Sequence, residues 1–189
     1  MRSKILLPAL AFALLAPAPA YAHTGANAVF SFSSGFLHPV GGLDHLLAMF
    51  AVGLLGAQLG GRALWLVPSA FIAMMIGGAG LGFAGIGLPG VEYAISLSLV
   101  VIALPVALPL KVPSGIAMPL VGIFAIFQGS AHGAELPAEA GMAAYMAGFA
   151  VATALVHATG IGFGLAMKGV PARAAAAGVG AIGLAFLVA

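Results

Sequence analysis

The sequence has no cysteine among its 189 residues, and only 5% of them are charged. Without cysteine there is no disulfide framework, no thiolate metal site and no cysteine nucleophile. The scarcity of charge excludes a soluble globular domain, in which about a quarter of the residues are charged. Hydrophobic residues instead make up 63% of the chain, and its mean hydropathy is +1.21. We therefore predict an integral membrane protein, with the lipid bilayer as its surroundings.

Basic residues are too few to form a surface for nucleic acid. Six Lys and Arg against four Asp and Glu give a formal charge of +2, so the pI near 9.3 reflects scarce charge and not a basic patch. The sequence has no G-x-x-x-x-G-K-[ST] loop, and its apolar stretches leave no soluble domain to hold ATP. We expect neither nucleic acid nor nucleotide as a partner.

The first 22 residues have the pattern of a secretory signal peptide. Arg2 and Lys4 precede an apolar run, which ends at the small-x-small sequence Ala20-Tyr21-Ala22. Prolines interrupt this run, and it is too short to cross a hydrocarbon core of about 30 Å. We predict cleavage after Ala22, which leaves His23 at an N-terminus outside the cytoplasm.

Six apolar stretches follow, each near the 20 residues that a helix needs to cross a bilayer. They are 38–60, 63–86, 91–110, 114–133, 140–167 and 173–189. The connections between them are short and rich in glycine or proline. We expect one all-α membrane domain over 23–189, a bundle of six transmembrane helices.

If the N-terminus is external and each predicted helix crosses the membrane, the bases and the acids fall on opposite sides. The bases that fall on the cytoplasmic side, as the positive-inside tendency requires, are Arg62, Lys111, Lys168 and Arg173. The acids that fall at the external face are Asp44, Glu92, Glu135 and Glu139, the last of them in a loop that we expect to be solvated. Acids have little influence on topology, so their clustering suggests that this face collects a cation.

Two histidines and an acid stand together in the first apolar stretch: His38, Asp44 and His45. On an unbroken helix the two histidines lie about 10.5 Å apart along the axis, too far to share one ion. Pro39 and the pair Gly41-Gly42 argue against an unbroken helix, so we expect an irregular turn that brings His38 toward the other two. A buried His–Asp hydrogen bond at a helix start is the structural alternative, but intramembrane ionisable groups usually mark a functional pathway.

Further candidate ligands lie in the later stretches. Gln128, His132 and Glu135 are spaced i, i+4, i+7 and line one helical face. Glu92 opens the third helix, where a carboxylate also suits the positive end of the helix dipole. We place His157 past the midplane of the fifth helix, with no other ionisable residue at its depth. The alternative is a core histidine bonded to a carbonyl.

The candidate ligands are imidazoles and carboxylates, which suit Ni²⁺, Co²⁺, Zn²⁺ or Fe²⁺. Mg²⁺ and Ca²⁺ prefer oxygen ligands, and Cu⁺ prefers sulfur. Two carboxylates such as Asp44 and Glu92 are a minimum for neutralising a dication in a medium of low dielectric. His23 at a free N-terminus would offer its α-amine and ring Nδ1 to one metal ion, so we consider it a capture site.

At these residues the sequence resembles the HupE/UreJ family, small membrane proteins associated with hydrogenase and urease systems. The matching segments are 38–45, 91–93 and 128–135. The resemblance implies a secondary permease for Ni²⁺ or Co²⁺ in the cytoplasmic membrane of a bacterium, without a prosthetic group. It also implies that the metal route is formed or fed by His38, Asp44, His45, Glu92, His132 and Glu135. Gln128 departs from the pattern, because many relatives are expected to have histidine there.

Other classes of function fit part of the pattern. An intramembrane zinc-dependent hydrolase would use the His/Asp cluster to activate water, with Glu92 or Glu135 as base. A haem protein would pair His45 or His132 with His157, and an accessory protein of hydrogenase or urease maturation would need no transport. The candidate ligands outnumber those of one catalytic metal, so we favour transport over an enzyme. The coupling ion, the oligomeric state and the client pathway stay open.

Overall fold

The computed structural model describes residues 31–135 and 142–189, and within these ranges all regular elements are helices. They are α2 (Phe32–Leu37), the short 3-10 helix η1 (His38–Gly41), α3 (Leu43–Leu59), α4 (Ala63–Phe83), α5 (Val91–Ala107), α6 (Ser114–Ala134), α7 (Met142–Ala166) and α8 (Val170–Val188). The predicted signal peptide and His23 lie outside the described residues.

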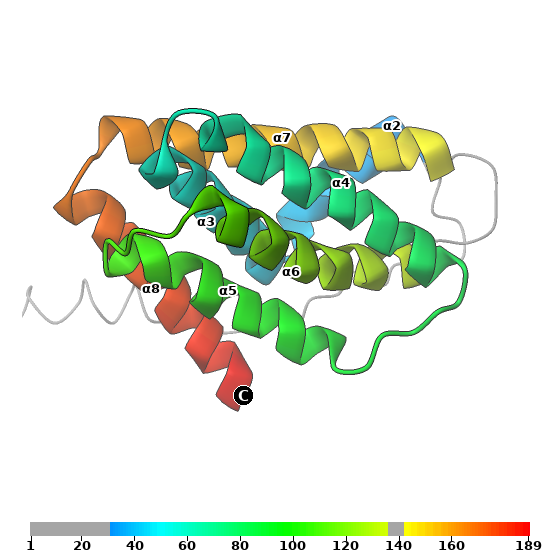
Figure 1. The fold of residues 1–189 in the computed structure, drawn as a ribbon. Helices are drawn as coiled ribbons and strands as arrows, with labels where there is room; N and C mark the ends of the chain where they lie inside the picture. The colour runs from blue at the N-terminus through cyan, green and yellow to red at the C-terminus, as the bar shows by residue number, and fades with distance from the viewer. Residues whose placement is uncertain (1–30, 136–141) are drawn as a thin grey trace, which may run out of the picture.

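The helices form one bundle around a continuous apolar core. Helices α3 to α7 run roughly along a common direction, and α8 is inclined to them (Figure 1). The pairs that pack most extensively are α4 with α6, α3 with α7 and α5 with α8. Residues from six helices, α3 to α8, meet in the core, among them Val52, Phe71, Leu99, Val121 and Phe149.

The helices support the prediction of a membrane protein. Four of them, α4, α6, α7 and α8, are long and apolar enough to cross a membrane. The bent pair Phe32–Gly41 and Leu43–Leu59 raises the number to five if it counts as one span. Helix α5 is also apolar but has only 17 residues. Six spans stay a prediction, in which α5 is the sixth.

The first predicted span, 38–60, is wrong in its start, whereas the irregular turn predicted within 39–42 is confirmed. The helix begins earlier, at Phe32, because Ser31 and Ser34 form a capping box before it. The axis then turns by 90° between Gly41 and Leu43, where Gly42 adopts an extended conformation. The break falls in the segment whose proline and glycines argued against an unbroken helix. The other helices match their predicted stretches within a few residues at each end.

Glycines allow the helices that carry the histidines to approach backbone to backbone. A methyl group at Gly129 or Gly133 of α6 would overlap the backbone carbonyls of Met75 and Ala79 on α4. In the same way, a methyl group at Gly35 of α2 would overlap the carbonyl of Tyr145 on α7. Small residues of this kind permit close packing of helices in membranes. These contacts hold the end of α6 against α4, and α2 against the start of α7.

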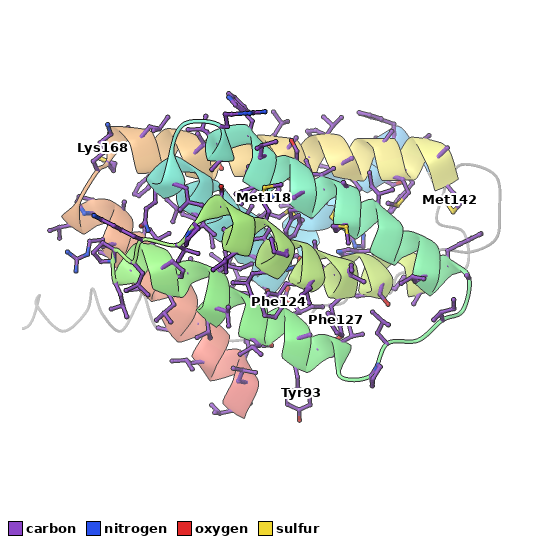
Figure 2. All side chains as sticks on the ribbon, in the orientation of Figure 1. Tyr93, Met118, Phe124, Phe127, Met142 and Lys168 are labelled. Carbon is purple, nitrogen blue, oxygen red and sulfur yellow. The ribbon has the colours of Figure 1, made fainter. Side chains whose placement is uncertain are left out.

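The two ends of the bundle carry opposite charges. The acids of the described residues lie at one end, at the start of α3, the start of α5 and the end of α6: Asp44, Glu92 and Glu135. The bases lie at the other end, in the connections and at the start of α8: Arg62, Lys111, Lys168 and Arg173. Figure 2 shows Met142 and Lys168 at the two ends of α7. The predicted separation of acids from bases is confirmed for these residues, whereas the side that each end faces stays a prediction.

Candidate metal centre

The bend before α3 brings both histidines of the first motif to the end of α6. Nε2 of His38 lies 2.8 Å from Nδ1 of His132, so one ring donates a hydrogen bond to the other. The ring centroids of His45 and His132 are 4.4 Å apart. His38 and His45 therefore meet at a third imidazole instead of lying on one straight helix, as an unbroken first span would require.

Asp44 fixes the orientation of His45. Its Oδ1 lies 2.9 Å from Nδ1 of His45 and also accepts a hydrogen bond from the backbone N–H of His45 at 2.9 Å. A carboxylate beside Nδ1 favours the tautomer with the proton on that atom, which leaves Nε2 as a lone-pair donor. That Nε2 is buried and has no hydrogen-bond partner in the part of the chain that the structure describes. Asp44 and His45 thus have the arrangement of a carboxylate behind a metal-binding imidazole.

Three residues can offer ligand atoms to one metal ion. One atom each from His38, His132 and Glu135 lies within 4.8 Å of the others. His132 is only 6% exposed and its Nε2 is buried without a partner, whereas Glu135 is exposed. The group therefore reaches from the end of the bundle into its interior. Its imidazole and carboxylate donors suit Ni²⁺, Co²⁺ or Zn²⁺.

Aromatic side chains of α7 form one wall of the centre. The ring of Phe149 lies 4.5 Å from that of His132 and 5.7 Å from that of His38, measured between centroids. Tyr145, one turn earlier on α7, has its ring 5.7 Å from His38. These contacts hold the imidazoles in place and limit access of water from that side. Sequence reasoning missed both residues, because nothing distinguishes them by type from ordinary core aromatics.

Polar side chains continue inward from the histidines along α6. Gln128 lies one turn before His132 and is fully buried. Its amide nitrogen donates a hydrogen bond to Oγ of Ser98 on α5 at 3.3 Å, while its Oε1 has no partner. Oγ of Ser98 in turn donates to the carbonyl of Ile95. The amide oxygen of Gln128 thus lies one helical turn inside His132 without a partner among the described residues. Sequence reasoning also missed Ser98, which supports the Gln128 amide.

His157 lies deeper in the bundle and is separate from the three-residue group. It is 1% exposed, its ring packs against Phe71 with 5.1 Å between centroids, and neither ring nitrogen has a hydrogen-bond partner among the described residues. The alternative of a core histidine bonded to a carbonyl is therefore wrong. Phe149, Thr153 and His157 are spaced four residues apart, so one face of α7 leads from the centre to this imidazole over about 12 Å.

Glu92 is a further predicted site residue that the structure leaves apart from the three-residue group. It is exposed in the first turn of α5, and it does not belong to the group formed by His38, His132 and Glu135. The N-cap of α5 is Gly90, with no side-chain capping bond. A carboxylate in this turn still complements the helix dipole.

Comparison with known proteins identifies the family of this chain. The family model described as HupE / UreJ protein matches residues 10–187, which include the whole centre. The chain belongs to the HupE/UreJ family. A curated relative, Protein HupE of Rhizobium leguminosarum bv. viciae, is 46% identical over 191 residues, which cover 98% of each chain. No solved structure matches this HupE/UreJ chain. The resemblance read from segments 38–45, 91–93 and 128–135 is therefore confirmed as family membership.

Proposed function

We propose that this HupE/UreJ protein is a secondary permease that takes up Ni²⁺ or Co²⁺ across the cytoplasmic membrane without ATP. The observation that carries the proposal is the convergence of His38, His132 and Glu135 within 4.8 Å at the acidic end of the bundle. These residues come from segments far apart in the sequence, and two of them would be costly to place in a membrane without a function.

Glu135 is the entry ligand, because it is the exposed member of the group. From there the ion passes to His38 and His132, which replace its water by imidazole nitrogen. His45, oriented by Asp44, offers a further Nε2 beside His132. Glu135 and Asp44 together carry two negative charges, which balance a dication as it leaves water.

The inner part of the route offers few ligands. Oε1 of Gln128 and the ring of His157 are buried and without partners, and each is a single donor. Sparse sites suit conduction, because an ion must leave each site as easily as it enters. The proposed route therefore begins at a site with several ligands and continues through positions that hold the ion weakly.

The proposal includes a topology. The basic end of the bundle faces the cytoplasm and the acidic end faces outside, in agreement with the positive-inside tendency. Helix α5 serves as the sixth span, since about 17 residues are enough to cross a thin or locally adapted bilayer. His23, left at the N-terminus by cleavage after Ala22, captures the ion before the centre does.

A zinc-dependent hydrolase fits the geometry less well. Such an enzyme needs a cavity that brings its substrate to the metal. Among the described residues, a cavity of about 780 Å³ is lined by residues of the basic end, including Lys111 and Lys168, and so lies away from the histidines.

Metal uptake into proteoliposomes tests the proposed function. Purified protein in vesicles should give saturable uptake of Ni²⁺ and Co²⁺, compared with Zn²⁺, with and without a proton gradient. His132→Ala should abolish that uptake, because it removes the imidazole shared by the other two histidines. Wild-type vesicles that bind Ni²⁺ but admit no more than empty vesicles would refute transport and favour an accessory role in maturation.

A further inference from the structure

The basic end of the bundle contains a cavity that the metal route does not use. Its volume is about 780 Å³, within the range of about 300–1,000 Å³ that is usual for ligand pockets. The walls come from the ends of α3, α5 and α7, the start of α8 and the link between α5 and α6. Much of the wall is apolar, with Leu54, Val106 and Leu165 among its residues.

Three positive charges line this cavity: Lys111, Lys168 and Arg173. The described residues contain a fourth base, Arg62, which is not part of the lining, and no acid lines the cavity. The positive-inside tendency accounts for bases at this end of the bundle. Three of them around one hollow give it a positive potential, which attracts an anion.

Hydrogen bonds between helices hold the cavity in shape. The amide nitrogen of Gln58 on α3 donates to the carbonyls of Pro105 and Leu110, at 2.9 and 3.0 Å. Nε of Arg173 donates to the carbonyl of Ala107 at 3.1 Å, which ties the start of α8 to the end of α5. A guanidinium has five N–H donors, so this bond leaves others for a ligand.

We propose that the cavity binds an anionic phospholipid. The headgroup phosphate lies among Lys111, Lys168 and Arg173, and the acyl chains continue along the apolar wall into the bilayer. The bases stand at the helix ends, where lipid headgroups lie, and Lys168 is in the turn between α7 and α8 (Figure 2). Basic pockets between membrane helices on the cytoplasmic side suit such headgroups, since that leaflet is rich in anionic lipid.

The bound lipid has a physical role that follows from charge. It neutralises three positive charges at the end of the bundle through which, in the proposed function, a divalent cation leaves. It also links the α5–α6 connection to the α7–α8 connection, because Lys111 and Lys168 stand in these two segments. The inference does not depend on transport, since lipid binding is measured on the purified protein.

Native mass spectrometry of the full-length protein in detergent tests the inference. Phosphatidylglycerol is titrated in, with phosphatidylcholine as the control that has the same phosphate but no net charge. We expect the wild type to bind phosphatidylglycerol at least tenfold more tightly. Lys111→Gln, Lys168→Gln and Arg173→Gln should each weaken binding about fivefold, and the triple variant about a hundredfold. Arg62→Gln, which removes a base of the same end outside the cavity, should bind like the wild type.

Several outcomes overturn the inference. Equal binding of the two lipids, or undiminished binding by the triple variant, removes the role of the bases. If Arg62→Gln weakens phosphatidylglycerol binding as much as the single cavity variants do, binding depends only on the total charge of this end of the bundle. Inorganic phosphate that displaces the lipid and binds equally well shows a phosphate site instead of a lipid site. If the triple variant fails to give a monodisperse protein, the three single variants decide the question against Arg62→Gln.

Discussion

Replacement of Asp44 by asparagine tests the centre most sharply, because it removes a charge and little else. The asparagine Oδ1 can still accept both hydrogen bonds that His45 directs to Asp44, so the fold should be retained. The negative charge behind the imidazole disappears, and with it the support that keeps His45 basic and one of two charges that balance the dication. Asp44 is 26% and His45 13% exposed, so water replaces the lost interaction only in part.

The magnitude follows from what such supporting carboxylates contribute. Loss of a carboxylate behind a metal-binding imidazole usually costs about 10–100-fold in metal affinity. That range corresponds to about 1.4–2.7 kcal/mol. In proteoliposomes, Asp44→Asn should therefore raise the Ni²⁺ concentration for half-maximal uptake at least tenfold. Asp44→Ala should do more, because it also frees the His45 ring to turn.

The matched control is Glu139→Gln, which removes the same charge from the loop that the sequence predicts to be solvated. It should leave the concentration dependence within about twofold of the wild type, because an exposed charge is screened by salt. Circular dichroism and size-exclusion chromatography establish that each variant is folded. An unchanged half-maximal concentration in folded Asp44→Asn would refute the role of this carboxylate in the metal route.

Two further predictions concern the other histidines. His38→Ala and His45→Ala should each reduce Ni²⁺ uptake more than His157→Ala, because the first two meet at His132 and the third stands apart; the reverse order would place the main site deeper. Mass spectrometry of the mature protein should find His23 at the N-terminus, and His23→Ala should then raise the half-maximal Ni²⁺ concentration without lowering the saturated rate; an unaltered dependence would dismiss capture.

The number and bounds of most helices follow from the sequence, because the lengths of the apolar stretches decide them. Long apolar stretches separated by glycine and proline permit only helices in a membrane, and α4 to α8 lie close to the predicted stretches. The break near Pro39 and Gly42 could also be foreseen, since proline lacks an N–H and glycine disfavours helix. The 90° turn could not, because its angle depends on how α2 packs against α7 through Gly35.

In the candidate site too, the sequence indicates which residues matter but not how they are placed. His38, Asp44, His45 and His132 stand out in the sequence because charged and imidazole groups are rare in membrane helices. Their mutual placement depends on tertiary packing: His38 and His132 are 94 residues apart in the chain and in hydrogen-bond contact. Phe149 and Ser98 are typical of any buried helix, so their position beside polar ligands is visible only in three dimensions. Glu92 illustrates the opposite case, a conspicuous acid that the packing leaves outside the group.

The proposed route predicts that a stronger inner ligand should slow transport, and Gln128 is the place to test it. Gln128→His adds an imidazole one turn inside His132, in a buried position where the present side chain offers one bare oxygen. Nickel prefers imidazole to an amide oxygen, so the ion should be held more tightly between the centre and His157. Because conduction requires release, we expect a lower half-maximal Ni²⁺ concentration together with a lower saturated rate.

The control is Gln128→Leu, of similar size, which removes the inner donor and should raise the half-maximal concentration. A folded Gln128→His variant with both constants unchanged would mean that the ion does not pass this position, and the route would then have to leave the centre along α7 alone.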